Sequence, residues 1–318
     1  MIEIEKFHIA QREQVKKRVE ELSRRSDDIK CRVATTLKKL WVSERELLVV
    51  SNLEVFRDLK TRFPNFTEVI ELYEANAIGL AKLGLPFEAP PILIEGDPGL
   101  GKTLFASELA KLVGLPFFEI SMATISASFA LSGGNTQWSE GSVGFIANSL
   151  ADSKFGNPFF LLDEIDKPTQ DSRYNPVSPL YSLLESHSAK RFKDEALEIE
   201  LDASRVIWMA TANHLERIPE PILSRMRVIH IKKPDESQMK YVVMSIYNNV
   251  RNNKAFGHLL QPDLHEDALG VMVKMSPREA KLALESGCLK AILNNRNTLL
   301  PQDLPQMKKL EAYHVGFI

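Results

Sequence analysis

Short apolar runs alternate with helical stretches through the middle of the chain. The apolar residues of the helical stretches recur at spacings of three and four, which is typical of amphipathic helices. Strands that alternate with helices favour a parallel sheet covered on both faces, because each crossover connection places a helix against the sheet. The expected strands are residues 92–95, 116–121, 158–162, 205–210 and 227–231. The pattern therefore predicts an α/β fold, a three-layer α/β/α sandwich with a five-stranded parallel sheet.

The chain before this region is patterned as helix. Residues 1–60 are rich in charge and poor in proline and glycine, and a second amphipathic helix is expected over residues 43–60. An apolar stripe with alternating spacings of three and four, interrupted by Ser26, comprises Val15, Val19, Leu22, Ile29, Val33 and Leu40. The stripe fits either a coiled-coil seam or a face that packs on the next domain, and we favour the packing face. Pro64 breaks the helical pattern and marks a domain boundary.

The chain after Pro234 is also patterned as helix, and we interpret it as a separate lid. Helices are expected over residues 236–250, 266–275, 277–294 and 301–313. One more helix, over residues 66–82, leads from the boundary towards the first strand and ends at Gly84. The predicted organisation is a helical segment over residues 1–62, a sandwich domain over residues 63–234 and a helical lid over residues 235–318.

A glycine-rich turn joins the first expected strand to the helix that follows it. The turn reads Gly96-Asp97-Pro98-Gly99-Leu100-Gly101-Lys102-Thr103 and fits the pattern G-x-x-x-x-G-K-[ST] without a mismatch, with Leu104 next in the helix. The glycines let backbone N–H groups turn towards phosphate oxygens, and the helix directs its positive end to the same place. We expect Lys102 to reach the β- and γ-phosphates of ATP and Thr103 to bind Mg²⁺. A turn that merely connects two elements would not explain the lysine and threonine.

Polar residues follow two of the later strands. Asp163 and Glu164 end an apolar run, and Asn213 ends the run that begins at Ile207. The carboxyl ends of parallel strands open onto the ligand crevice, so these side chains should arrive beside the phosphates. We expect Asp163 to hold Mg²⁺ through water and Glu164 to polarise the attacking water. Asn213 could bond the attacking water or the γ-phosphate, although asparagine also follows strands simply as a turn residue.

Composition narrows the class of protein. The chain has 318 residues, of which 44% are hydrophobic and 26% charged, as in an ordinary globular protein. The formal net charge of −2 argues against a surface built mainly for nucleic-acid phosphates. Cys31 and Cys288 lie far apart and indicate reduced thiols in a cytoplasmic protein. The acidic start of the chain is no secretory signal, and no apolar run approaches the roughly 20 residues that span a bilayer.

The ordered series of motifs resembles that of the AAA+ ATPases, and within them the ATPase module of Lon proteases. Beyond the phosphate loop, the matching stretches are residues 161–167, 171–173 with Pro176, 183–185, 192–194 with Leu197 and Glu198, 210–213 and 218–226. The likeness is dense over residues 91–231, looser in the lid and absent from the first 60 residues. The series is highly specific for AAA+ ATPases and less specific for the Lon branch.

The resemblance implies an ATP hydrolase whose site is shared between the subunits of a ring, expected to be a hexamer. Asn213 is similar to the sensor that reads the γ-phosphate, and Arg225 to the arginine finger that enters the neighbouring subunit's site, with Arg227 as the alternative. Arg278, at the start of a lid helix, is similar to the lid arginine that contacts the same nucleotide. A surface arginine in a salt bridge remains the alternative for Arg225, and a solvated charge at a helix start for Arg278.

The family threads its substrate through the ring with an aromatic loop, and Trp138, flanked by glycines and serines, is the candidate here. The charged run that Lon proteins carry upstream is replaced by residues 125–131, which are uncharged. The chain ends at Ile318 and leaves no room for a Ser–Lys peptidase domain, so we expect no protease activity. We expect a motor that remodels or translocates a protein substrate. The alternatives are a nucleotide switch or scaffold that recruits a partner, and a DNA-acting motor.

Overall fold

The computed structural model describes residues 6–23, 28–135, 141–167 and 175–305. The chain divides into two compact units. The first unit comprises residues 1–60, 66–98 and 102–232, and the second comprises residues 61–65, 99–101 and 233–318. Each unit has its own hydrophobic core.

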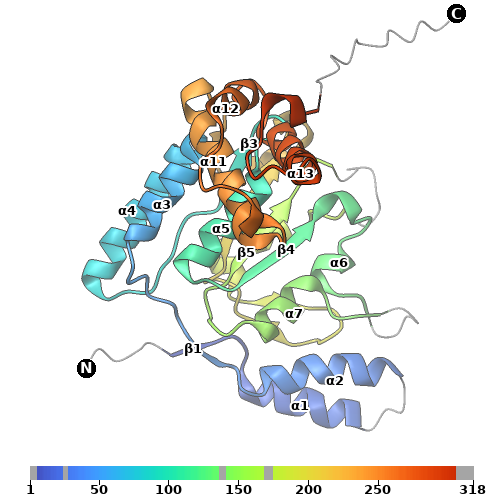
Figure 1. Cartoon of the computed structure of the whole chain (residues 1–318). Coiled ribbons are helices and arrows are strands. Elements are labelled where there is room, and N and C mark those ends of the chain that lie inside the picture. The colour runs from blue at the N-terminus through green and yellow to red at the C-terminus, as the bar shows by residue number, and fades with distance from the viewer. Residues whose placement is uncertain (1–5, 24–27, 136–140, 168–174, 306–318) are drawn as a thin grey trace, which may run out of the picture. The chain divides into compact units, whose positions relative to one another are not determined.

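A five-stranded parallel sheet organises the first unit, in the strand order β4-β5-β8-β3-β9. Its strands are β3 (Ile92–Glu95), β4 (Phe117–Ser121), β5 (Phe159–Asp163), β8 (Ile207–Ala212) and β9 (Arg227–His230). All five predicted strands are confirmed to within two residues at either end. The candidate site residues follow β3, β5 and β8, which are consecutive in the sheet, with β8 between the other two. Figure 1 shows β3, β4 and β5 of this sheet.

The two faces of the sheet bury different side chains, because successive residues of a strand point to opposite sides. On one face, the Phe160 ring packs edge-to-face on Trp208 of β8 and on Phe145 of α7 (Phe145–Asp152), at centroid distances of 5.2 and 5.6 Å. On the other face, Phe159 lies against Tyr73 of α4 (Thr67–Leu83), and α5 (Lys102–Val113) packs on β4, β5 and β8. The three-layer sandwich is thus confirmed.

The N-terminal part forms a pair of helices, α1 (Arg12–Ser23) and α2 (Asp28–Leu40), which lie side by side (Figure 1). Helix α2 packs on α7. Val15, Leu22, Val33 and Leu40 of the apolar stripe are buried in the core of the first unit. The stripe is therefore a packing face and not a coiled-coil seam.

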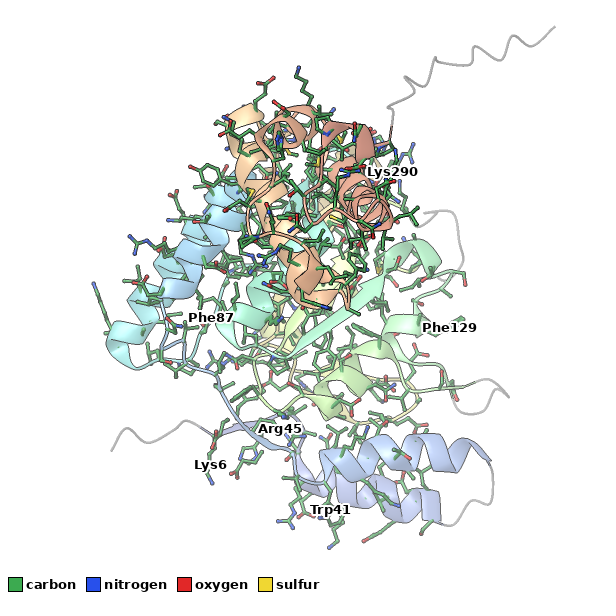
Figure 2. All side chains as sticks on the ribbon, viewed as in Figure 1. Lys6, Trp41, Arg45, Phe87, Phe129 and Lys290 are labelled. Carbon is green, nitrogen blue, oxygen red and sulfur yellow. The ribbon has the colours of Figure 1, made fainter. Side chains whose placement is uncertain are left out.

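The helix predicted over residues 43–60 is wrong in its first half. Strand β2 (Glu44–Glu46) pairs antiparallel with β1 (Lys6–His8), and helix begins only at α3 (Glu54–Arg62). The extended backbone lets Arg45 reach the end of α7, where it donates hydrogen bonds to the carbonyl oxygens of Ala151 (3.3 Å) and Ser153 (2.9 Å; Figure 2). These long-range contacts favour the strand over the local helical pattern.

Short elements connect the strands of the first unit. Strands β6 (Phe192–Lys193) and β7 (Glu200–Leu201) form a hairpin that the sequence pattern did not indicate. The short helices are α6 (Phe129–Ser132), α8 (Leu180–Leu183), α9 (Ser186–Ala189) and α10 (Glu220–Leu223). Single 3-10 turns occur at Met122–Thr124 and Leu215–Arg217, and a further one at Pro64–Phe66 lies where the chain passes from the second unit back to the first. Gly84 ends α4 in the left-handed conformation (φ 66°), as its position predicts.

The second unit is helical, with α11 (Glu236–Asn253), α12 (Glu266–Met272), α13 (Pro277–Leu293) and a 3-10 turn at Gly257–Leu259. Capping boxes begin two of its helices, Asp235 with Gln238 in α11 and Ser276 with Glu279 in α13. Its core buries Cys288, a free thiol whose pKa burial raises to about 11.

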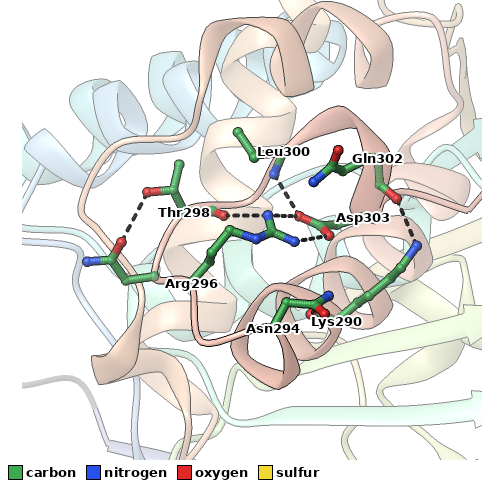
Figure 3. Close-up of polar contacts among 8 residues, drawn as sticks. Lys290, Asn294, Arg296, Thr298, Leu300, Gln302 and Asp303 are labelled. Carbon is green, nitrogen blue, oxygen red and sulfur yellow. Dashed lines mark hydrogen bonds and ion pairs between the residues drawn. The ribbon is translucent and has the colours of Figure 1, made fainter.

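The described chain after α13, up to residue 305, is held by an ion pair (Figure 3). Arg296 donates to both carboxylate oxygens of the buried Asp303 at 2.6 Å, which keeps the pKa of that carboxyl below its usual range. Lys290 donates to the carbonyl oxygen of Gln302 at 2.8 Å. Of the helix predicted over residues 301–313, the described part forms only the 3-10 turn Pro301–Asp303, because Pro305 cannot continue it.

Candidate nucleotide-binding site

The phosphate loop lies between β3 and α5, as the glycine pattern predicts. Gly99 and Gly101 have φ values of 84° and 88°, in the left-handed region that favours glycine. Helix α5 begins at Lys102, so its unpaired N–H groups and the positive end of its dipole lie at the end of the loop. The loop therefore has the backbone conformation that an anion site requires.

The ammonium group of Lys102 lies among oxygen atoms of the first unit. It donates to the carbonyl oxygens of Gly96 (2.6 Å) and Asp97 (3.1 Å) and to Oδ1 of Asn213 (2.8 Å). Burial lowers the pKa of Lys102, and nearby carboxylates, Glu95 foremost, oppose that shift. The structure thus brings Asn213, from the end of β8, into direct contact with the phosphate-loop lysine.

Asp163 ends β5 and accepts two hydroxyl groups on the same carboxylate oxygen. Thr103 Oγ1 donates to Asp163 Oδ1 at 3.0 Å, and Thr211 Oγ1 donates to it at 2.5 Å. The Thr103 hydroxyl and the Asp163 carboxylate, both predicted to serve Mg²⁺, therefore lie within one hydrogen bond of each other. Hydroxyl and carboxylate oxygens are ligands that suit Mg²⁺, which is usually held by one or two carboxylates together with substrate phosphates.

Glu164 occupies a backbone conformation that is uncommon for a residue with a side chain. Its φ is 55°, in the left-handed region. Two hydrogen bonds to Thr211 hold the turn, one from the Glu164 N–H to the Thr211 hydroxyl and one from the Ile165 N–H to the Thr211 carbonyl, both at 2.9 Å. Such conformations persist where surrounding contacts fix them, and they are frequent at functional sites.

Of the other predicted site residues, Arg278 lies beside Gly99 of the phosphate loop, where a Cβ on Gly99 would come 3.2 Å from the Arg278 Cβ. Arg225 is held in a separate ion pair with Glu185 at 2.6 Å and donates to the Pro221 carbonyl at 2.7 Å. Arg278 lies in the first turn of α13 in the second unit. Trp138 lies outside the described residues. The roles assigned to these three residues remain predictions.

Three residues at or near the site were missed by the sequence analysis. Thr211 belongs to a motif stretch but was given no role of its own, although a threonine on the strand two residues before Asn213 is a usable signal. Glu95 pairs with His230 at the ends of the adjacent strands β3 and β9. Glu185 was quoted within a matching stretch, but nothing local identifies it as the partner of Arg225.

Comparison with known proteins identifies the class. Residues 92–233 match the family model of the ATPase family associated with various cellular activities (AAA). The matched region starts at β3 and ends just after β9, so it covers the whole parallel sheet. The chain therefore contains an AAA ATPase domain.

The chain is similar to part of the Lon proteases. It is 33% identical over 219 residues to a Lon protease of Wolbachia pipientis subsp. Culex pipiens, covering 66% of this chain and 26% of that protein. It is 31% identical over 208 residues to a Lon protease of Rhizobium meliloti, covering 65% and 23%. With a peroxisomal Lon protease homolog 2 of Oryza sativa it shares 35% identity over 154 residues, covering 48% and 17%. The AAA domain is thus related to the ATPase module of Lon proteases.

A solved structure shares the fold. A proline-to-glycine mutant of Thermotoga maritima RuvB superposes with a TM-score of 0.52 and 13% sequence identity, covering 74% of this chain and 67% of that chain. At this identity the likeness supports the fold alone. None of the helices in the described part of the chain has the length and apolar character needed to cross a bilayer.

Proposed function

We propose that this chain binds MgATP at the cluster around Lys102 and hydrolyses it. The observation that carries the proposal is the joining of three strand ends by hydrogen bonds: Lys102 to Asn213, Thr103 to Asp163, and Thr211 to both Asp163 and Glu164. A glycine turn that merely connected two elements would not need these contacts. These contacts form two hydrogen-bonded groups, one around Lys102 and one around Asp163, and they support a site in which the lysine and the acids act on the same ligand.

In this proposal each residue has a defined role. Gly96–Leu104 enclose the phosphates with backbone N–H groups, and Lys102 exchanges a protein oxygen for a phosphate oxygen. Thr103 and Asp163 hold Mg²⁺, which neutralises charge on the phosphates. Glu164 orients and polarises the attacking water. Asn213 senses whether the γ-phosphate is present, through its hydrogen bond to Lys102. Because all three Lys102 protons already have protein acceptors, phosphate binding would release Asn213 or a loop carbonyl.

We further propose a homo-oligomeric ring, expected to be a hexamer, in which Arg225 of one subunit completes the site of the next. Arg225 makes no contact with Lys102 or Asp163 within the described residues, which is consistent with a role outside its own subunit. Arg278 would contact the same nucleotide from the lid. The organisation into residues 1–62, 63–234 and 235–318, and a cytoplasmic location, belong to the same proposal.

The work done by hydrolysis is proposed to be remodelling or translocation of a polypeptide, gripped by the loop that carries Trp138. The relation to Lon proteases supports a protein substrate, although the chain covers at most about a quarter of the Lon sequences named above. A nucleotide switch that recruits a partner remains the second candidate, because Trp138 lies outside the described residues.

Glu164→Gln tests the assignment of the base. The amide keeps the size of the side chain but cannot accept a proton, so turnover should fall roughly a hundredfold or more while ATP still binds. Glu216→Gln, an exposed glutamate of the same unit, is the matched control. Unchanged turnover in Glu164→Gln would remove Glu164 from the mechanism. Failure of the unmodified protein to bind ATP with magnesium would refute the whole proposal.

Trp138→Ala separates the motor from the switch. A motor should keep its basal ATP turnover but lose the stimulation produced by an unfolded polypeptide such as casein. A switch should respond to its partner equally well with tryptophan or alanine at this position. Turnover that is stimulated by DNA, and that weakens steeply with salt, would instead favour the DNA-acting motor.

A further inference from the structure

The base of the loop that carries Trp138 is closed by its own backbone. Gly134 donates its N–H to the Ser142 carbonyl at 2.9 Å, which joins the two arms of the loop. A Cβ on Gly144 would lie 2.3 Å from both the Gly133 nitrogen and the Leu131 oxygen. The arms therefore touch at Gly133 and Gly144, and a side chain at Gly144 would force them apart.

A buried carboxylate, Asp194, ties this base to the β6–β7 hairpin. Its Oδ2 accepts the Gly144 N–H at 2.8 Å, and its Oδ1 accepts the N–H groups of Ala196 and Leu197 at 2.9 Å each. A Cβ on Gly133 would lie only 2.6 Å from that carboxylate. The side chain of Asp194 is thus enclosed between the loop and the hairpin, with hydrogen bonds to both.

A second contact joins the same two segments beside the carboxylate. The Glu195 N–H donates to the Ser132 carbonyl at 2.8 Å. Arg18 of α1 also holds the hairpin: it pairs with Glu198 at 2.9 Å and donates to the Ala196 carbonyl at 3.4 Å. The hairpin is therefore held from both sides, so it is a firm support for the loop.

The chemistry of the position requires aspartate. Both oxygens of Asp194 accept N–H groups, one oxygen from the hairpin and the other from the loop. An asparagine has one acceptor oxygen, and its amide nitrogen would face an N–H donor. Burial raises the pKa of Asp194 to about 6, with the negative charge of Glu195 adding to the rise and the three N–H groups opposing it. Burying a carboxylate costs free energy, and the three N–H groups that Asp194 accepts offset part of that cost.

We infer that Asp194 is a positioning residue that fixes the base of the Trp138 loop to the β6–β7 hairpin, so that the loop acts on a polypeptide from a rigid support. This inference rests on the proposed function. The hydrogen bonds place Asp194 at the junction but not in contact with nucleotide-site residues, so its effect should be confined to the response to substrate.

Two measurements on the full chain test the inference, with Asp194→Asn as the variant and Glu195→Gln, an exposed neighbouring carboxylate, as the matched control. Hydrogen exchange of a peptide covering residues 141–147 reports the Gly144 N–H directly. Loss of a hydrogen bond to a charged acceptor should speed its exchange roughly tenfold to a hundredfold. ATP turnover at increasing casein concentration reports the use of the loop, and the half-saturating casein concentration should rise several-fold.

If Asp194 had only a structural role, Asp194→Asn would lower the thermal midpoint of unfolding. The half-saturating casein concentration would then stay at the wild-type value. Exchange at Gly144 as slow in Asp194→Asn as in Glu195→Gln would overturn the inference. Fast exchange with an unchanged casein response would overturn its functional half. If casein does not stimulate ATP turnover of the unmodified protein, the proposed function is refuted, and so is the role of Asp194 in the response to substrate. Hydrogen exchange at Gly144 would still decide whether Asp194 holds the loop.

Gly133→Ala provides a second route if Asp194→Asn does not fold. The added methyl group would lie 2.6 Å from the Asp194 carboxylate, so the carboxylate must move while the residue itself stays aspartate, and the φ of 80° at Gly133 adds backbone strain at the same base of the loop. It should give the same two changes as Asp194→Asn. Wild-type exchange and casein response in a folded Gly133→Ala protein would contradict the inference.

Discussion

Thr211→Val isolates the contact that holds the turn at Glu164, the proposed catalytic base. Valine has nearly the shape of threonine, and Thr211 is buried, so packing should be preserved. The substitution removes the hydroxyl that donates to Asp163 and accepts the Glu164 N–H. Asp163 keeps its bond from Thr103, whereas the Glu164 N–H loses its side-chain acceptor.

The size of the effect follows from these two bonds. A bond to a charged acceptor contributes about 1.5–3 kcal/mol, and a donor left unsatisfied costs about 1–3 kcal/mol. We expect unfolding to require about 2–4 kcal/mol less free energy, a fall in thermal midpoint of roughly 5–10 °C. The left-handed turn at Glu164 stores about 1–3 kcal/mol, so losing about 1–2 kcal/mol of support should lower kcat roughly fivefold to thirtyfold.

Steady-state ATP turnover and thermal unfolding measure both consequences, with Thr211→Ser as the matched control. Serine keeps the hydroxyl and loses one methyl group, so its kcat should stay near wild type while stability falls by about 1 kcal/mol. ATP affinity should be similar in all three proteins, because Lys102 does not contact Thr211. If valine and serine gave the same kcat, Thr211 would not orient Glu164.

Three further outcomes are expected. Mixing Arg225→Ala with Glu164→Gln should restore part of the turnover that each variant lacks, because a shared site can pair intact Glu164 with intact Arg225. Mixing with Arg227→Ala in place of Arg225→Ala tests the alternative finger. No recovery of turnover in the first mixture would refute the shared site. Tyr73→Phe should raise the thermal midpoint by roughly 2–4 °C, because the buried Tyr73 hydroxyl has no hydrogen-bond partner among the described residues; a fall would contradict this. The pKa of Asp194 is raised from 3.8 to about 6, so its contribution is fully present below pH 3.8 and lost as pH rises through 6. Relative to Asp194→Asn, the unfolding free energy of the wild type should therefore fall by about 2–2.5 kcal/mol between pH 4 and pH 7 in urea titrations, and parallel curves would refute it.

Local sequence patterns predicted most of the helices and strands of the fold. The alternation of apolar runs and helical stretches predicted the parallel strands, because a buried strand and an amphipathic helix each leave a periodic signal in the sequence. The same argument failed over residues 43–60, where Glu44–Glu46 form a strand. Nothing local at Glu44–Glu46 reports that Lys6–His8 will pair with it, or that Arg45 will reach the end of α7.

Local patterns also identified the parts of the candidate site but not their connections. The glycine turn and the acid pair Asp163 and Glu164 are contiguous motifs, so their chemistry can be recognised without coordinates. The bond from Lys102 to Asn213 joins residues 111 positions apart, and no spacing rule predicts it. The pairing of Arg225 with Glu185 is equally invisible in the sequence.

The sequence by itself determined the class of the domain, the phosphate loop and the two acids, because each depends on residues that are neighbours in the chain. Only the tertiary structure decided that Thr211 bridges Asp163 and Glu164, and that Asp194 joins a loop to a hairpin. Both depend on the order of strands in the sheet and on the crossing of distant segments. Those arrangements are set by the burial of the whole core and not by any short stretch of residues.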